Sequence, residues 1–227
     1  MSSLLHLLHL SDPSLPIGSF SHSNGLETYV QEGIVFNKAT AKEFVWQQLS
    51  QNIHFTDAAL TSLAFDAAAK NDLATALKLD ALCHASKLAS ETRTASFKLG
   101  TRLLKIFELE PSFTLPAQFH QKIKTGQAQG HYCIAFGLLA SAMNARKEEA
   151  LTGFYYNAAT ASITNAVKLI PLGQQDGQEL LLSLFPKIQE LVQWNMAPAI
   201  DRIGFCCSGF DIRCMQHEQL YSRIYMS

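Results

Sequence analysis

Serine, histidine, proline and glycine are concentrated in residues 11–29, SDPSLPIGSFSHSNGLETY, near the start of the chain. Side chains of these types can form a nucleophile elbow, a phosphate-binding loop or a metal site. The stretch contains neither the Gly-x-Ser-x-Gly pattern of a nucleophile elbow nor the Gly-Lys-Ser/Thr ending of a phosphate-binding loop. We therefore expect its serines to form turns and helix caps, and we predict a protein without catalytic residues or a cofactor.

Histidine and cysteine side chains offer a second chemistry, which is metal binding. His6 and His9 are spaced to share one face of a helix, and His22 lies in the loop that follows. A further group near the end of the chain has the spacing C-C-x6-C-x2-H and consists of Cys206, Cys207, Cys214 and His217. Structural zinc sites favour C-x2-C pairs, and adjacent cysteines seldom ligate one ion well. We favour free thiols and predict no metal site, with nickel storage or transfer through these residues as the alternative.

The end of the chain, residues 215–227, reads MQHEQLYSRIYMS. Chain ends are usually frayed and polar, whereas this one carries Tyr, Met and Arg, the residue types enriched in protein interfaces. The segment either folds back on its own domain or becomes ordered against another chain, and composition alone favours neither.

The elements that must position these residues are helices. Apolar residues recur at helical spacing through almost the whole chain, and the β-like run GIVFN at 33–37 is too short to build a sheet. We predict one all-α domain over 1–227, a bundle of roughly eight to ten helices, in which 205–227 is a C-terminal segment ordered by a partner. Asn24 with Glu27 resembles a capping box before a short helix that extends to Gln31, and Asp176 is read as the N-cap of a later helix. Residues 111–116 and 125–130 read as loops, and Pro186 is predicted to kink or split the last long helix.

Composition excludes some classes of protein. Hydrophobic residues make up 48% of the chain and charged residues 16%, with a formal net charge of −1 and no run of either sign. This balance argues against a nucleic-acid binder or a protein held electrostatically on a membrane. Cys83 and Cys133 lie inside helical patterns, so we read them as small core residues of a protein in a reducing compartment. No stretch reaches the roughly 18 apolar residues of a membrane span, and we expect a cytoplasmic protein.

Three stretches, in this order, resemble the UreF family of urease accessory proteins: LPIGSFSHSNGLE at 15–27, AVKLIPLGQQDGQ at 166–178 and MQHEQLYSRIYMS at 215–227. The resemblance covers essentially the whole chain. It implies an all-α, generally dimeric protein that is not itself an enzyme. Proteins of this family join UreD, called UreH in some organisms, and the nickel-carrying GTPase UreG on apo-urease. There they help to assemble the nickel site, and UreF is thought to gate the GTPase.

The same resemblance assigns residues to partners. Glu27 closes the first family motif and Lys168 precedes the Pro-Leu-Gly-Gln of the second, and both are associated with the face that meets UreG. Gln174 and Gln178 fall in the glutamine-bearing turn that follows. The tail pattern associated with docking UreD/UreH is matched by His217, Tyr221 and Arg223. From the residues alone, Lys168 is read equally well as a cation that neutralises the negative end of a helix dipole.

Overall fold

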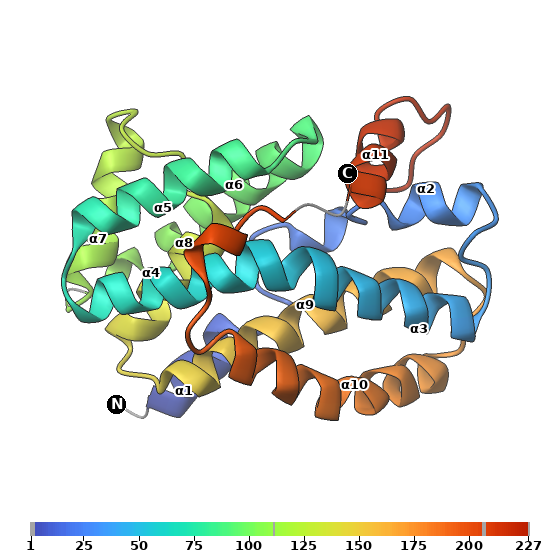
Figure 1. Cartoon of the computed structure of the whole chain (residues 1–227), viewed down its shortest axis with the longest axis horizontal. Helices are drawn as coiled ribbons and strands as arrows, with labels where there is room; N and C mark the ends of the chain where they lie inside the picture. The colour runs from blue at the N-terminus through green and yellow to red at the C-terminus, as the bar shows by residue number, and fades with distance from the viewer. Residues whose placement is uncertain (1–2, 111, 206–207, 227) are drawn as a thin grey trace.

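The structure, a computed structural model, describes residues 3–110, 112–205 and 208–226. Within these ranges the regular secondary structure is entirely helical, as the sequence predicts (Figure 1). The α-helices are α1 (Ser3–Leu10), α2 (Leu26–Gln31), α3 (Lys38–Gln47), α4 (Ala59–Ala69), α5 (Leu73–Ser86), α6 (Ser90–Ile106), α7 (Thr114–Lys124), α8 (Tyr132–Ala142), α9 (Lys147–Leu169), α10 (Gln174–Trp194) and α11 (Ser208–His217). Short 3-10 turns are η1 (Ser19–Ser21), η3 (Phe107–Leu109) and η4 (Ile200–Arg202), and η2 (Gln48–Ala58) is π-helical.

Helices α3, η2 and α4 form one continuous rod, so the described residues contain ten separate helical rods, within the predicted eight to ten. The rod begins at a capping box, in which Asn37 Oδ1 accepts from the Thr40 N–H at 3.0 Å and Thr40 Oγ1 accepts from the Asn37 N–H at 3.0 Å. Its middle part, η2, has the wider π-helical hydrogen-bond pattern. Most π-helical segments are only one turn long, and they often occur at functional sites.

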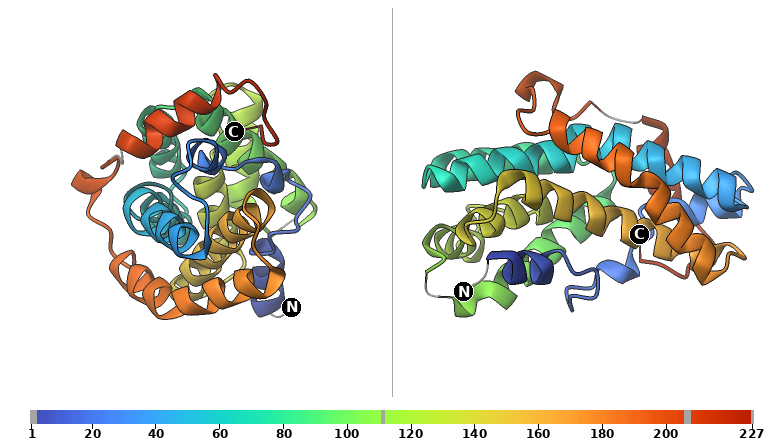
Figure 2. Two further views of the ribbon diagram at one scale, coloured as in Figure 1. Left: turned by 90° about the vertical axis from the view of Figure 1, so that its right-hand side faces the viewer. Right: turned by 90° about the horizontal axis from the view of Figure 1, so that it is seen from below.

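The core is centred on α8 and α9. Residues 133–140 of α8 are all buried, because α4 and α6 pack on this helix from two sides. The longer α9 contacts α1, α2, α3, α4, α8 and α10, which gives it a central position in the bundle. Figure 2 shows α10 and α11 on opposite sides of the bundle, with the α3–α4 rod and α9 between them. Most of the buried apolar side chains of the described residues form one contiguous cluster.

Two local predictions about proline were wrong in detail. Residues 111–116 are not wholly a loop, because α7 begins at Thr114 and places Pro116 in its first turn, where backbone N–H groups need no helical partner. Pro186 does not split α10, which is continuous, whereas a kink at this residue stays a prediction. Pro186 and Leu182 lie on the exposed face of this helix, so water can satisfy the Leu182 carbonyl that proline leaves without a donor.

The two ends of the described chain lie apart. In Figure 1 the N-terminal α1 is beside the lower left part of the bundle, whereas α11 and the C-terminal residues lie at the top, next to α2. The helices that the structure describes include none with the length and apolarity needed to cross a bilayer.

Candidate functional site

The predicted cap of α2 was wrong, and the correction explains where Glu27 points. Asn24 and Gly25 both have left-handed backbone, with φ of 51° and 83°, and Gly25 is the residue that precedes α2. A capping residue normally has extended backbone, so Asn24 does not cap this helix. Gly25 also allows α11 to approach closely, because a Cβ at this position would lie 3.0 Å from the Cys214 sulfur. Glu27 is therefore free of a capping role.

Glu27 instead binds the C-terminal tail. Its carboxylate is only 2% exposed. Oε1 accepts from the Ile224 N–H at 2.8 Å, while Oε2 accepts from the Tyr225 N–H at 3.1 Å and lies 3.1 Å from His217 Nε2. A buried carboxylate must be paired or hydrogen-bonded to offset the cost of removing it from water. Here the tail supplies every one of these contacts.

His217 connects Glu27 to a second carboxylate. The His217 ring is fully buried, with Nδ1 at 2.8 Å from Glu91 Oε2 of α6. Arg223 Nη1 donates to the other Glu91 oxygen at 2.6 Å. Two carboxylates therefore face one imidazole and one guanidinium group in this contact. We call Glu27, Glu91, His217 and Arg223 the tail clasp.

Further contacts continue the attachment of the tail. The Met226 N–H donates to the Ser21 carbonyl at 2.8 Å, and Gln31 Nε2 donates to the Ser222 carbonyl at 3.1 Å. Tyr225 is buried, whereas Tyr221 is fully exposed at 107%. Of the two arrangements that the sequence leaves open, the described part of the tail adopts the fold-back on its own domain. Ordering of 205–227 by a partner stays a prediction.

The remaining predicted residues form a second group. Lys168 lies in the last turn of α9, Gln174 is the first residue of α10, and Gln178 lies one turn further along α10. All three are exposed near the connection between the two helices, which we call the α9–α10 turn. This turn lies at the right-hand end of the bundle in Figure 1. The structure therefore joins Glu27, His217 and Arg223, and it groups Lys168 with the two glutamines elsewhere.

Asp176 is not the N-cap of α10, which was a wrong prediction. It lies in the first turn, where its Oδ2 accepts from the backbone N–H of Gly173, the capping residue, at 3.1 Å. Its other oxygen accepts from Lys38 Nζ of α3 at 2.9 Å, and Lys38 also pairs with Glu179. Hydrogen bonds from Lys38 lower the pKa of both carboxyl groups. These contacts fasten the α9–α10 turn to α3.

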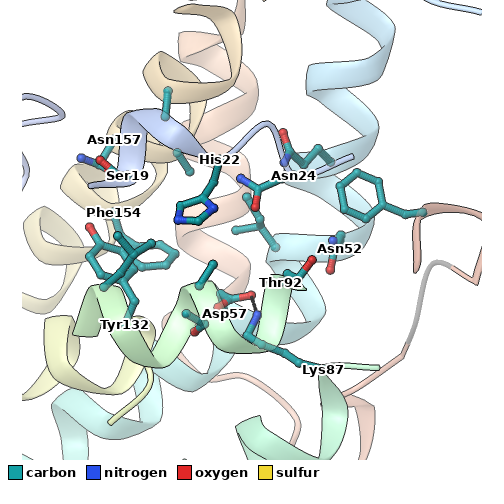
Figure 3. A pocket seen from close by; sticks show the side chains of 18 residues that line it. Ser19, His22, Asn24, Asn52, Asp57, Lys87, Thr92, Tyr132, Phe154 and Asn157 are labelled. Carbon is teal, nitrogen blue, oxygen red and sulfur yellow. Dashed lines mark hydrogen bonds and ion pairs between the residues drawn. The ribbon is translucent and has the colours of Figure 1, made fainter. Parts of the chain in front are cut away.

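The opening loop also covers a cavity of about 140 Å³ (Figure 3). His22 points into it from the loop, and an ion pair between Asp57 and Lys87, with 2.8 Å between Oδ2 and Nζ, lies across from it. Burial lowers the pKa of His22, and nearby Arg102 adds to the effect. Burial alone would raise the pKa of Asp57, but the charge and hydrogen bond of Lys87 hold it below its ordinary value.

The metal-ligand alternative does not gather its residues in the described part of the chain. His9 packs its ring edge against Phe107, with centroids 5.4 Å apart, and His217 belongs to the tail clasp. Neither His6, His22 nor Cys214 joins a described group of three or more ligand side chains. Cys206 and Cys207 lie outside the described residues. The loop serines act locally as expected, since Ser21 Oγ donates to the Gly18 carbonyl at 2.7 Å.

Two elements of this geometry escaped sequence reasoning. Glu91 carries no signal in the sequence that links it to the tail. Asp57 does carry one, because it is the only carboxylate between Gln47 and Phe65, a stretch that contains neither lysine nor arginine. A lone carboxylate in a helix that is buried along much of its length calls for a partner, although the sequence does not reveal that the partner is Lys87.

Comparison with known proteins agrees with the resemblance. The sequence model of the UreF family matches residues 35–185. The chain is 49% identical over 227 residues to the urease accessory protein UreF of Actinobacillus pleuropneumoniae serotype 3 (strain JL03), covering all of both chains. It is 48% identical over 221 residues to UreF of Haemophilus influenzae (strain PittEE), covering 97% of this chain and 94% of the relative. It is 35% identical over 228 residues, again with complete coverage of both, to UreF of Bacillus sp. (strain TB-90).

The helical fold and these matches together define an all-helical urease accessory protein. The chain belongs to the UreF family.

Proposed function

We propose that this chain is a non-catalytic adaptor of urease maturation. Together with UreD/UreH it recruits and regulates the GTPase UreG, so that nickel is inserted into apo-urease, and it acts as a homodimer. The observation that carries this proposal is membership of the urease accessory family along the whole chain. Regulation follows from differential affinity. The adaptor binds one state of the GTPase better than another, and it can favour that state by no more than the difference between the two binding free energies.

The proposed contact with UreD/UreH is the exposed part of the tail. Tyr221 has its whole side chain in solvent, and Arg223, two residues further along the chain, is partly exposed. An exposed tyrosine next to an arginine is typical of an interface hot spot. Because Tyr221 is fully exposed, its replacement leaves the tail clasp intact.

Co-purification tests this contact. Tyr221→Ala should weaken capture of UreD/UreH, whereas Tyr156→Ala, at a part-exposed tyrosine of α9, should not. Equal capture by the Tyr221 variant and the parent would remove the tail from the proposed interface. A chain that ends at Met215 is a less specific probe, because it also deprives the buried Glu27 of its partners.

The proposed contact with UreG is the α9–α10 turn. Lys168, Gln174 and Gln178 offer a cation and two amides on one exposed turn, which suits a polar partner surface. Lys168→Ala should reduce recruitment of UreG and leave capture of UreD/UreH unchanged. Lys70→Ala, at an exposed lysine that follows α4, is the matched control. Loss of both partners in Lys168→Ala would indicate misfolding and contradict the assignment.

Glu27 contributes to this function indirectly in our proposal. Its carboxylate is buried under the tail, so it positions the tail and does not touch a partner while the clasp is closed. This interpretation expects Glu27→Gln to weaken UreD/UreH capture together with tail protection. The homodimer is tested by light scattering on the purified chain, where a monomer mass at micromolar concentration would contradict it.

A further inference from the structure

Two cysteines and a carboxylate meet inside the bundle, away from the tail clasp and the α9–α10 turn. They come from three elements: Asp57 from η2, Cys83 from α5 and Cys133 from α8. The ligand atoms of these three side chains all lie within 4.8 Å of one another. Both cysteines are completely buried, which confirms that they are core residues. Simple core packing does not account for a carboxylate so close to both of them.

The backbone around the cluster is held in place by a neighbouring carboxylate. Asp80 of α5 is buried, and its oxygens accept from the backbone N–H groups of Gly130 and His131, at 3.1 and 2.9 Å, just before α8. Residues three apart share a helix face, so Asp80 fixes the face of α5 that also carries Cys83. Thr61 Oγ1 donates to the Cys133 carbonyl at 3.1 Å and fixes α8 against the α3–α4 rod.

The sulfur separation fits ligation of one ion. The two Sγ atoms are 3.5 Å apart. Zinc–sulfur bonds of about 2.3 Å at a tetrahedral angle place two thiolates about 3.8 Å apart, whereas a disulfide requires about 2.05 Å. The observed separation is therefore close to that of two thiolates on one cation and well above that of a covalent bond.

The charges of the cluster also suit a divalent cation. Two thiolates and the Asp57 carboxylate carry three negative charges. Lys87, whose Nζ lies 2.8 Å from Asp57 Oδ2, and a divalent cation carry three positive charges, so the loaded site is neutral in the interior. A carboxylate has two oxygens and can ligate a metal with one while it accepts from Lys87 with the other.

We propose that Asp57, Cys83 and Cys133 form a binding site for one thiophilic divalent cation, for which Zn²⁺ is the reference ion. Asp57 and Lys87 line the cavity under the opening loop (Figure 3), so water in this cavity can reach the site. The fourth position is taken by water from this cavity, as in zinc sites with three protein ligands and an open position. The site is distinct from the proposed docking surfaces and does not depend on the adaptor function.

Cobalt substitution tests the proposal on the full chain. All variants carry Ser at Cys206 and Cys207, which removes the thiols outside the described residues. After chelator treatment and reduction, Co²⁺ should bind one equivalent and produce a thiolate-to-metal charge-transfer band that Zn²⁺ abolishes by displacement. Cys83→Ser and Cys133→Ser should each lose the band. Cys214→Ser, at a buried cysteine of α11 outside the cluster, should keep it.

A second measurement needs no substitution within the cluster and remains decisive if the buried substitutions fail to fold. X-ray absorption of the zinc-loaded chain that carries Ser at 206 and 207 and an intact cluster should find two sulfur neighbours around the metal. Absence of sulfur from the zinc shell, or a charge-transfer band that survives Cys83→Ser in a folded chain, would overturn the proposal. The proposal would also be overturned if the chain does not bind Zn²⁺ and mild oxidation forms a disulfide between Cys83 and Cys133. That result would assign the pair to redox chemistry.

Discussion

The attachment of the tail depends on the charge of Glu27, and Glu27→Gln tests this dependence. The substitution keeps the shape of the side chain but removes its charge and one acceptor oxygen. The backbone N–H groups of Ile224 and Tyr225 and the ring of His217 then share a single neutral acceptor at a site that is 2% exposed.

The expected cost follows from this geometry. A hydrogen bond to a charged group contributes about 1.5–3 kcal/mol, and removal of one partner from a buried ion pair costs about 3–5 kcal/mol. Because glutamine retains one acceptor, we expect the substitution to weaken attachment of the tail by about 3 kcal/mol. This loss corresponds to a roughly 150-fold shift of the equilibrium between attached and detached tail toward the detached state. The stability of the helical core should change less, since the clasp is not part of the main cluster of buried apolar side chains.

Hydrogen exchange resolved to the tail peptides measures this shift, because local opening sets the protection of the Ile224 and Tyr225 amides. Glu32→Gln is the matched control: Glu32 follows α2 and pairs with Arg213 of α11 in a part-exposed position. A surface pair contributes less than about 1 kcal/mol, so protection should fall less than about fivefold. Unchanged protection in Glu27→Gln, or an equal loss in Glu32→Gln, would refute the reasoning.

Three further predictions concern the core. Burial lowers the pKa of His54, so as the pH falls the unfolded chain takes up this proton before the folded chain does. The contribution of neutral His54 to the free energy of unfolding is therefore complete above about pH 6.5 and is lost as the pH falls below that value. His54→Gln should flatten this loss of stability when denaturant unfolding is compared between about pH 7.5 and about pH 5. Tyr155→Phe, which removes the hydroxyl that contacts His54 at 3.2 Å, should lower the free energy of unfolding by about 1–2 kcal/mol in the same assay, and a neutral result would contradict this estimate. Gly100→Ala should cost about 1–3 kcal/mol or more because its Cβ would lie 2.1 Å from the Gly130 carbonyl oxygen. Gly209→Ala, where no such contact exists, should not destabilise, so equal losses would disprove the steric explanation.

Most of the helical fold could be predicted from the sequence, because helical periodicity is a local property. The stripe from Val45 through Leu49 and Ile53 to Ala67 predicts the α3–α4 rod within a few residues. Predictions of caps were less successful. Asn24 and Asp176 have the residue types of caps, but the left-handed backbone at Asn24 and the use of Gly173 as the cap of α10 depend on how the flanking segments pack.

The sequence by itself determined the all-helical class, the family and the identity of the polar residues in its three motifs. The tertiary structure decided which of those residues meet. Glu27 and His217 are 190 positions apart, and the resemblance associates them with different partners, yet they share one buried clasp with Glu91. Asp57, Cys83 and Cys133 come together in the same way from three helical segments. Periodicity reports which face of a helix is buried, but the contact between two faces is set by the packing of the whole bundle.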